Sequence, residues 1–169
     1  MKGIPMKIIV AADNKWGIGK DNSLLARLPA DMKRFREITT GNTIVMGSRT
    51  YMSFPKRPLP DRENLVITSK PALYPEVRCF ESAEAFLAFA RECREEIYVC
   101  GGGMVYRELL PYCEKAEVTR VLHDFEADTF FPNLDENGDW EITEKSEIVE
   151  TNGFNVQFVT YVNKNVKAV

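Results

Sequence analysis

The sequence is poor in the residues that build metal sites and disulfide frameworks. It has four cysteines, none of them spaced as C-x-x-C, and a single histidine that is not close in sequence to any of them. These spacings fit neither a zinc site nor a disulfide scaffold. We therefore expect no bound metal, and thiols that stay reduced in a cytosol.

Long apolar runs and blocks of positive charge are also absent from the sequence. The run from Ile8 to Ala12 ends at Asp13, which is too short for the core of a signal peptide, and no run approaches the length of a membrane span. With a net charge of −3, the chain has no basic block that would attract nucleic acid. We expect a cytoplasmic protein, monomeric by default, whose partner is a small molecule and neither a nucleic acid nor a membrane.

The composition is that of one ordinary globular domain. The chain has 169 residues, of which 44% are hydrophobic and 28% charged. A chain of this length can bury a stable core without disulfides or structural metals. We expect a single domain over residues 1–169 with an α/β fold: a central, mostly parallel, twisted sheet with flanking helices and a C-terminal antiparallel hairpin. Strands are expected at residues 6–12, 43–46, 64–68, 77–80, 97–100 and 116–122, with the hairpin at 140–150 and 154–162 across Asn152 and Gly153. Ser82 is expected to begin a capped helix. Residues 13–25 and 125–132 are expected to be irregular, and residues 1–5 to be a disordered or edge extension.

Residues 96–110 predict a buried strand that passes through three glycines into a helix. The apolar run 97–100 precedes the glycines 101–103, and from Met104 the apolar residues recur at helical spacing. Glycines let a ligand approach the backbone, and the free N–H groups of a first helical turn favour an anion such as phosphate. The spacing does not match G-x-G-x-x-G, because its third glycine would fall on Tyr106. A tight crossover without a ligand is therefore an open alternative.

A second glycine-containing turn is expected at residues 47–51. Gly47, two hydroxyl residues and Arg49 coincide there with the start of a short helix, which is a stronger phosphate signal than glycine alone. The polar segment 68–70 follows another parallel strand, and ligands of open α/β sheets gather at such strand ends. Two phosphate-compatible turns predict a ligand with a pyrophosphate or several phosphates.

The segment 28–41 predicts a helix that begins at Pro29 and ends at a glycine. Its apolar stripe includes Phe35 and Ile38, and Asp31 lies on the same face, four residues before Phe35. The other charged residues of the helix are expected on a solvated face, and they are Lys33, Arg34, Arg36 and Glu37.

A carboxylate on an apolar face is costly without a partner. Asp31 is open to two explanations. It either caps the first turn of the helix, where the dipole favours an anion, or lines an apolar pocket and binds the polar edge of a ligand. The second explanation suits a flat heteroaromatic ring that carries an amidine-like pair of N–H groups.

The loop 13–25 carries Gly17 and Gly19 on either side of Ile18, with Trp16 just before them. A pliable backbone with apolar side chains is typical of lids that close over a ligand. An ordinary loop that its tryptophan anchors to the core is an equal alternative.

The proline-rich loop at 54–63 cannot pair as a strand and holds Arg57 and Arg62 on a stiffened backbone. Loop arginines are usually only solvated. Rigidly held arginines, however, are preferred for forked recognition of a carboxylate.

The order of these segments closely resembles the dihydrofolate reductase family over nearly the whole chain. Each motif alone is weak, but their joint order and spacing are highly specific. They are the first strand, the Gly-Ile-Gly loop, Leu28-Pro29-Ala30-Asp31 with Phe35, Val45-Met46-Gly47 with Thr50, the segment from Arg57 to Arg62, Cys100-Gly101-Gly102-Gly103 with Val105 and Tyr106, Thr119, and Asp128-Thr129-Phe130-Phe131-Pro132. The resemblance implies NADPH-dependent reduction of 7,8-dihydrofolate to 5,6,7,8-tetrahydrofolate.

The resemblance also implies roles for individual residues on the substrate side. Asp31 would be the catalytic residue and would hydrogen-bond the pterin's N3 and 2-amino edge, with support from Thr119. Phe35 and Phe54 would enclose the pterin and the aminobenzoyl group, and Arg62 would pair with the glutamate α-carboxylate. The implied substrate-binding residues are Ile9, Val10, Ala11, Asp31, Met32, Phe35, Phe54, Arg57, Leu59, Arg62, Cys100, Tyr106 and Thr119.

On the cofactor side, Gly101 and Gly102 would be joined by a cis peptide beside the nicotinamide. The turns that begin at Gly47 and Gly103 would flank the pyrophosphate, and residues 68–70 would face the adenosine end. The implied NADPH-binding residues are Ala11, Ile18, Gly19, Asn22, Leu24, Gly47, Ser48, Arg49, Thr50, Ile67, Thr68, Ser69, Lys70, Cys100, Gly101, Gly102, Gly103, Met104, Val105, Tyr106 and Thr129. The implied reaction is hydride transfer to C6 with protonation at N5, in which a water admitted under the lid, and not Asp31 directly, supplies the proton.

The chain departs from the family pattern at three places. Ala26 stands where the family usually has a tryptophan that helps to fix a water near the substrate, which bears on substrate affinity and antifolate response. Ser48 and Met104 replace residues that grip the 2′-phosphate, so a preference for NADPH over NADH depends on Arg49, Thr68, Ser69 and Lys70. The segment 54–56 carries one residue more than the common pattern.

Two rival functions compete with this interpretation. A reductase of the riboflavin-pathway type shares the fold and the glycine turn but lacks the Leu-Pro-x-Asp helix, so Asp31 with Arg62 counts against it. A non-catalytic nucleotide-binding module needs only the glycine turns and leaves Asp31 as a cap.

Overall fold

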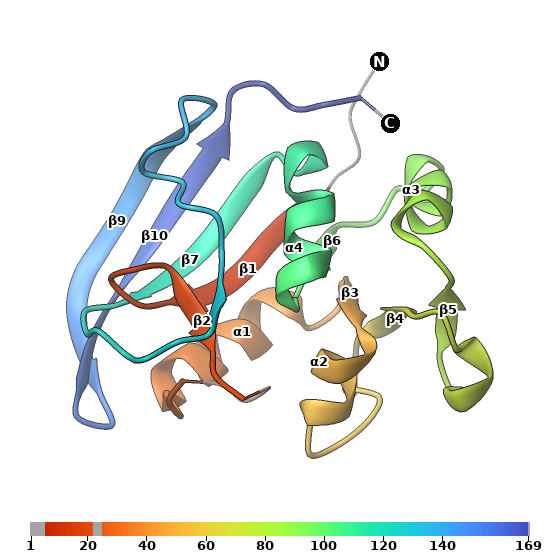
Figure 1. Cartoon of the computed structure of the whole chain (residues 1–169), viewed down its shortest axis with the longest axis horizontal. Coiled ribbons are helices and arrows are strands. Elements are labelled where there is room, and N and C mark those ends of the chain that lie inside the picture. The colour runs from red at the N-terminus through yellow and green to blue at the C-terminus, as the bar shows by residue number, and fades with distance from the viewer. Residues whose placement is uncertain (1–5, 22–24, 169) are drawn as a thin grey trace.

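The computed structural model describes residues 6–21 and 25–168, and its centre is an eight-stranded sheet (Figure 1). The strands of this sheet are β1 (Met6–Ala12), β3 (Thr43–Gly47), β4 (Glu63–Ile67), β5 (Arg78–Phe80), β6 (Ile97–Val99), β7 (Lys115–Val121), β9 (Trp140–Thr151) and β10 (Phe154–Asn163). They follow the order β5-β4-β3-β6-β1-β7-β10-β9. The six strands from β5 to β7 in this order are parallel, and β10 is antiparallel to both of its neighbours. The expected α/β class with a C-terminal antiparallel hairpin is confirmed.

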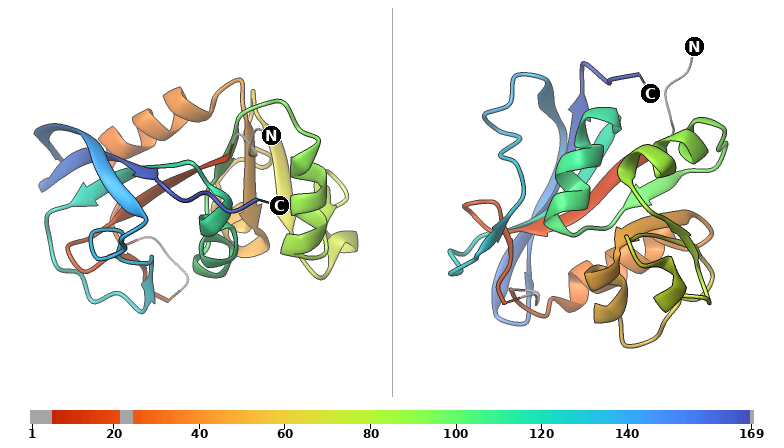
Figure 2. Two further views of the ribbon diagram at one scale, coloured as in Figure 1. Left: turned by 90° about the horizontal axis from the view of Figure 1, so that it is seen from above. Right: turned by 45° about the vertical axis from the view of Figure 1, so that its right-hand side comes forward.

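Helices cover both faces of the sheet. They are α1 (Pro29–Thr39), α2 (Ser48–Ser53), α3 (Ala83–Arg91) and α4 (Gly103–Leu109), with the short 3₁₀ turns η1 (Pro71–Leu73) and η2 (Leu110–Tyr112). The chain runs outward from β1 to β5 and then returns to β6 and β7, and parallel crossovers are right-handed. The helices of the outward and return paths therefore lie on opposite faces, as Figure 2 shows for α1 and α4.

The neighbouring strands β3 and β6 make their next connections in opposite directions. From β3 the chain continues through α2 to β4, whereas from β6 it continues through α4 to β7 on the far side of β1. Such a reversal opens a crevice at the carboxyl ends of the two strands, which is where ligands bind in open α/β sheets.

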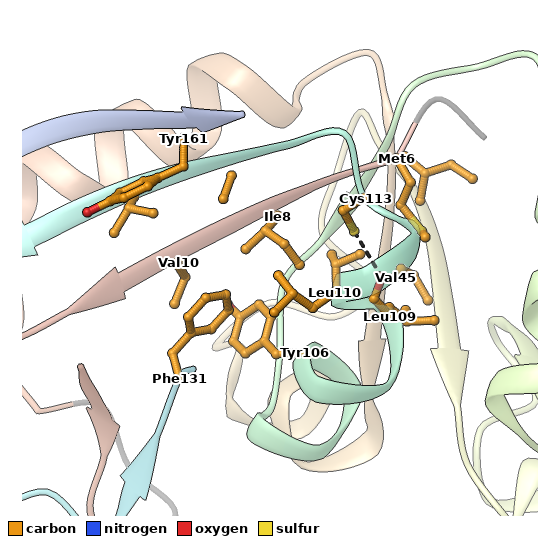
Figure 3. Close-up of a cluster of buried hydrophobic side chains, with 14 of the residues drawn as sticks. Met6, Ile8, Val10, Val45, Tyr106, Leu109, Leu110, Cys113, Phe131 and Tyr161 are labelled. Carbon is orange, nitrogen blue, oxygen red and sulfur yellow. Dashed lines mark hydrogen bonds between the residues drawn. The ribbon is translucent and has the colours of Figure 1, made fainter. Parts of the chain in front are cut away.

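Two hydrophobic clusters fill the space between the sheet and its helices. Met6, Ile8 and Val10 of β1 point to one side, where α3 and α4 contribute residues such as Leu109 (Figure 3). Ile9 points to the other side, into a cluster packed against the α1 face. This alternation is the period of two that a strand buried on both faces requires.

Local signals in the sequence predicted the ends of several elements correctly. Gly41 follows α1 at a positive φ of 83°, which glycine adopts without strain. Asn152 (φ 49°) and Gly153 (φ 83°) form the hairpin turn, and both left-handed residues suit the twist of the flanking strands. Ser82 caps α3 by accepting a hydrogen bond from the backbone N–H of Ala85 at 3.1 Å.

The expectation that residues 13–25 and 125–132 are wholly irregular is wrong. β2 (Gly17–Gly19) pairs antiparallel with β8 (Thr129–Phe130) in a small second sheet. Gly-Ile-Gly carries no strand pattern of its own, so the pairing depends on a partner more than a hundred residues away. The expected extension at 1–5 and part of the expected lid, residues 22–24, lie outside the described residues. In the described part of the chain, no helix has both the length and the apolar character needed to cross a membrane.

Candidate active site

The two glycine-containing turns meet at the crevice between β3 and β6. The backbone N–H of Gly47 donates to the carbonyl of Gly101 at 2.8 Å. Gly101 has a φ of 117° and is joined to Gly102 by a cis peptide, as the resemblance implied. A Cβ on Gly101 would lie 3.2 Å from the ring of Tyr106 and 3.4 Å from the hydroxyl oxygen of Thr50. Bare backbone is therefore required here, and it borders the starts of both α2 and α4.

Tyr106 ties this turn to the centre of the sheet. Its hydroxyl donates to the carbonyl oxygen of Ile9 at 2.7 Å, and its side chain is buried. Burial raises the pKa of the Tyr106 phenol well above its usual value, so the residue is a neutral donor. The ring also packs edge-on against Phe131, which follows β8.

Asp31 lies in the first turn of α1 and reaches the neighbouring strand β7. Its Oδ1 accepts a hydrogen bond of 2.6 Å from the hydroxyl of Thr119, whose side chain is buried. Burial raises the pKa of the Asp31 carboxyl, while the Thr119 hydrogen bond and the charge of Arg34 lower it. The N-cap position Leu28 has no side-chain cap, and the partner of Asp31 is the side chain of Thr119 on another element. The geometry therefore favours the pocket explanation over the cap.

Apolar residues line the space between Asp31 and the proline-rich loop. Phe35 of α1 and Phe54 have ring centroids 6.4 Å apart with planes tilted by 41°. These residues share one cluster with Ile9, Leu59 and Cys100. Burial raises the pKa of the Cys100 thiol, which stays protonated. Together, Ile9, Phe35, Phe54, Leu59 and Cys100 form what we call the apolar wall, and the Asp31 carboxylate lies at one end of it.

Arg62 stands at the other end of this wall. Its guanidinium lies 6.0 Å from the ring centroid of Phe35 and donates to the hydroxyl of Thr39 at 3.2 Å and to the carbonyl of Pro60 at 2.8 Å. Asn64 fixes the loop by accepting from the N–H of Leu59 and donating to its carbonyl, each at 2.9 Å. Arg62 is therefore held on a rigid loop, as the sequence predicted.

Other residues expected on the substrate side are placed less favourably. The side chain of Val10 lies in the cluster on the opposite face, so it can reach a ligand only through its backbone. Met32 is 48% exposed. Arg57 is exposed and donates to the carbonyl of Met52 at 2.6 Å.

Several of the expected cofactor-binding residues lie at the starts of α2 and α4 and along the end of β4. Thr129 packs against Gly103, where a Cβ would lie 3.0 Å from its methyl group. Thr68 is buried and its hydroxyl accepts from the N–H of Lys70 at 3.1 Å, while the Lys70 and Ser69 side chains are exposed. Ile18 packs against the larger core cluster. Met104 is 69% exposed and brings no charge to the start of α4. Asn22 and Leu24 lie outside the described residues.

Sequence inspection missed the residue that organises the loop after β1. Asp13 is fully buried, and its Oδ1 accepts from the N–H groups of Lys15 at 2.9 Å and Gly17 at 2.7 Å. Its Oδ2 accepts from the N–H of Phe125 at 3.0 Å. The loop is thereby joined to the segment before β8. An aspartate directly after a buried strand was the available signal.

Trp16 anchors the same loop to the core, as one of the two alternatives expected. It is buried, stacks on Phe131 with centroids 5.9 Å apart, and meets the edge of Tyr161 at 5.7 Å. The guanidinium of Arg120 lies 4.1 Å from the Trp16 ring and pairs with Asp135 at 3.1 Å. Residues 13–21 of the loop are therefore held by the contacts of Asp13 and Trp16.

The prediction that the charged residues of α1 lie on a solvated face is wrong at Arg34. Arg34 was expected on a solvated face, but its Nη2 pairs with Glu117 of β7 at 2.9 Å. Sequence spacing along the helix gave no sign of the acidic residue on a distant strand.

Comparisons with known proteins agree with this geometry. The family model described as dihydrofolate reductase matches residues 5–163. The dihydrofolate reductase of Bacillus subtilis is 36% identical over 163 residues, which cover 95% of each chain, and that of Staphylococcus haemolyticus is 36% identical over 94% of this chain and 95% of its own. A solved structure of dihydrofolate reductase from Enterococcus faecalis, complexed with NADP(H) and RAB-propyl, superimposes with a TM-score of 0.84 at 34% identity, covering 96% of this chain and 99% of that one. The chain therefore belongs to the dihydrofolate reductase family, whose function is the reduction of dihydrofolate.

Proposed function

We propose that this protein reduces 7,8-dihydrofolate to 5,6,7,8-tetrahydrofolate with NADPH, and that the residues described above carry the reaction. The observation that carries the proposal is the partly buried Asp31, held by Thr119 at 2.6 Å at the end of an apolar wall. The same wall connects through Ile9 and Tyr106 to the glycine turn. We infer that the carboxylate and the nucleotide site border one space.

The pterin edge is the natural partner of Asp31. The Thr119 hydroxyl donates to Oδ1, so it orients the carboxylate and leaves Oδ2 and the second lone pair of Oδ1 for N–H groups of the ligand. A carboxylate accepts two parallel N–H bonds from an amidine-like edge, and charge-assisted bonds of this kind are the strong ones. Asp31 therefore fixes the pterin in the wall and stabilises positive charge that develops on the ring.

The residues of the crevice fit a nicotinamide dinucleotide. Gly101 and Gly102 present bare backbone beside the Thr50 hydroxyl, in a space that a Cβ would narrow. When bound there, NADPH supplies the hydride that C6 of dihydrofolate accepts. The N5 proton comes from water, and Asp31 assists by raising the basicity of the pterin through its charge. Orientation of the two rings by the wall and the glycine turn provides a large part of the acceleration.

The benzoyl-glutamate half of the substrate fits the other end of the wall. Phe35, Phe54 and Leu59 offer apolar surface for the aminobenzoyl ring. Arg62 presents its guanidinium beside this surface, where a forked pair with the α-carboxylate can form. Arg57, exposed on the same loop, has a weaker role at the rim.

The adenosine end of NADPH is assigned to the ends of β3 and β4. Arg49, Thr68, Ser69 and Lys70 lie there, and the exposed Lys70 offers a cation to a 2′-phosphate. The exposed, uncharged Met104 offers none. We expect the protein to prefer NADPH over NADH, and the preference to depend on Arg49, Thr68, Ser69 and Lys70 alone.

We also propose that the protein acts as a monomer in the cytoplasm and takes no nucleic acid as a partner. The net charge of −3 and four cysteines, none of them in a disulfide among the described residues, support this assignment. Analytical ultracentrifugation measures the oligomeric state directly.

The function is tested by following the absorbance of the reduced nicotinamide with dihydrofolate as the second substrate. NADPH and NADH are assayed side by side, and a deaminated pyrimidine of the riboflavin pathway is the alternative substrate. Dihydrofolate-dependent oxidation of NADPH is expected. Turnover of the pyrimidine alone would assign the rival reductase, and cofactor binding without turnover of either substrate would assign a binding module.

A further inference from the structure

Two side-chain contacts join α1 to β7, and they lie one helical turn apart. Asp31 accepts from Thr119, and Arg34 Nη2 donates to Glu117 Oε2 at 2.9 Å. Residues three apart are neighbours on a helix surface, and residues two apart share a face of a strand. The Arg34–Glu117 ion pair is therefore placed next to the carboxylate of the proposed site.

The guanidinium of Arg34 is held by more than this ion pair. Glu117 Oε2 also accepts from the hydroxyl of Thr160 at 2.9 Å, and the Arg34 guanidinium lies 4.7 Å from the ring centroid of Phe158. In the β7–β10 register, Glu117 is opposite Thr160 and Thr119 is opposite Phe158. The same face of the paired strands β7 and β10 thus provides both the contacts of Arg34 and the partner of Asp31.

The pair is also shielded from solvent more than an ordinary surface ion pair. The Arg34 side chain is 33% exposed and the Glu117 side chain 18%. Charges in such a setting are screened less than exposed ones, so they act on their neighbours over longer distances.

We propose that Arg34 is a positioning residue. Its guanidinium is held by Glu117 and Phe158, with Thr160 holding Glu117, on the side of α1 where its positive charge acts on Asp31. The inference rests on the proposed function, because Asp31 is the carboxylate assigned to the pterin. Arg34 needs no contact with the substrate in this role. It acts through the carboxylate that does make contact.

The charges around Asp31 support this role. Burial raises the pKa of the Asp31 carboxyl, and the charge of Arg34 opposes that rise. Among the described residues, the Tyr106 phenol of α4 also interacts electrostatically with the Asp31 carboxyl, and burial raises its pKa, so it is neutral. Burial likewise raises the pKa of the Cys100 thiol, which interacts with Tyr106, so this group is also neutral. Glu117 holds Arg34 in place and also partly offsets its charge.

Removal of the Arg34 charge and removal of the Glu117 charge are therefore expected to shift the pKa of Asp31 in opposite directions. Arg34→Met takes away the stabilising cation, so Asp31 should titrate at a higher pH. Glu117→Gln keeps an acceptor oxygen for Arg34 but takes away the offsetting negative charge, so Asp31 should titrate at a lower pH. A purely structural role, in which either change loosens α1 and wets the carboxylate, predicts the same direction for both variants.

The test is a ¹³C NMR titration of the aspartate carboxyl carbons in the unliganded protein, with Asp31 assigned from the signal lost in Asp31→Asn. We expect a rise of about 0.5 to 1 pH unit in Arg34→Met and a fall of a few tenths, roughly, in Glu117→Gln. Arg34→Lys should stay close to the wild type, because it keeps the charge. Arg36→Met is the matched control, since Arg36 is exposed on the same helix. Shifts of equal sign in the two main variants, or a shift in Arg34→Met no larger than that of the control, would overturn the inference.

The second readout is the pH dependence of dihydrofolate turnover. The acid limb of kcat/KM should move upward in Arg34→Met and downward in Glu117→Gln, in parallel with the NMR titration. The two readouts separate the proposals, because the titration needs no substrate. A wild type that ignores dihydrofolate would refute the proposed function alone, whereas an active wild type with an unmoved Asp31 in Arg34→Met would refute only the role of Arg34.

Discussion

The hydroxyl of Thr119 donates to Asp31 across 2.6 Å, although the two residues are 88 positions apart in the sequence. One comes from the first turn of α1 and the other from the middle of β7. Both side chains are withdrawn from solvent, so the contact is a short bond to a charge in a partly apolar setting. It orients the one carboxylate on the wall that Phe35 and Phe54 form.

Asp31→Asn should keep the fold and the affinity for NADPH but lose about 10²-fold or more in turnover near neutral pH, as expected when a charged group that assists proton transfer is removed. The amide oxygen can still accept from Thr119, so the pocket stays intact. Steady-state kinetics and a fluorescence titration with NADPH measure the two effects. Glu37→Gln is the control, because Glu37 is exposed on the same helix. Wild-type turnover in Asp31→Asn would return this residue to the role of a helix cap.

The same substitution should stabilise the fold at neutral pH. The folded-state pKa of Asp31 is raised, chiefly by burial, so its contribution to stability is complete below the unfolded value near 3.9 and is lost as the pH rises through the folded value. Ionised Asp31 therefore costs stability at pH 7, and an asparagine does not carry that cost. Urea unfolding should place Asp31→Asn above the wild type at pH 7.5 and bring the two together at about pH 4. A constant difference at both pH values would contradict the assignment.

Arg62→Leu should raise the KM for dihydrofolate about 10- to 100-fold and leave kcat within a few-fold, since a lost charge-assisted bond is worth roughly 1.5–3 kcal/mol. Arg62→Lys should recover only part of the affinity, because a lysine cannot form the forked pair. Arg91→Leu removes one positive charge on α3, on the other face of the sheet, and serves as the control. Equal losses in KM and kcat would argue against recognition of the carboxylate by Arg62.

Gly101→Ala should destabilise the protein by about 1–3 kcal/mol and weaken NADPH binding. Gly101 has a φ of 117°, and an added Cβ would lie 3.2 Å from the Tyr106 ring. Gly138→Ala is a close control, because its Cβ would meet nothing within 4 Å and its φ is not positive. Thermal unfolding with and without NADPH compares the two variants. A Gly101→Ala protein as stable as Gly138→Ala would show that the turn tolerates a side chain.

The sequence predicted the features that short segments determine by themselves. Alternation along residues 154–162, the Asn152-Gly153 turn and the serine before α3 each depend on a few neighbouring residues, and the structure confirms them. The glycine turn could be identified for the same reason. Its position beside Gly47 follows from the parallel topology, which brings the carboxyl ends of β3 and β6 together.

Features that depend on distant partners were not predictable from local patterns. The β2–β8 pairing, the Arg34–Glu117 ion pair and the buried Asp13 each involve residues from remote parts of the chain. A charged residue on a helix is usually solvated, so Arg34 was assigned to the solvent until its partner on β7 was placed. Only the resemblance to a family linked Thr119 to Asp31 in advance.

Asp13 provides the sharpest test of how the loop after β1 is held. Three backbone N–H groups converge on its carboxylate, and the one from Phe125 comes from the segment before β8. Asp13→Ala leaves these donors without their acceptor inside the protein. The contact to Gly17 is buried and those to Lys15 and Phe125 are partly buried. One unsatisfied buried group costs about 1–3 kcal/mol, so a loss of at least about 1 kcal/mol is expected. Asp13→Asn keeps one acceptor oxygen, so its stability should lie between that of the wild type and that of Asp13→Ala.

Urea unfolding ranks these variants, and hydrogen exchange locates the effect. Faster exchange should appear at the Gly17 and Phe125 amides in Asp13→Ala, whereas amides of β3 should stay protected relative to the global stability. Asp124→Ala is the matched control, because Asp124 is exposed in the same segment. If Asp13→Ala were no less stable than Asp124→Ala, the loop would be held by Trp16 and its aromatic neighbours alone, and the carboxylate would be dispensable for joining β2 to the segment before β8.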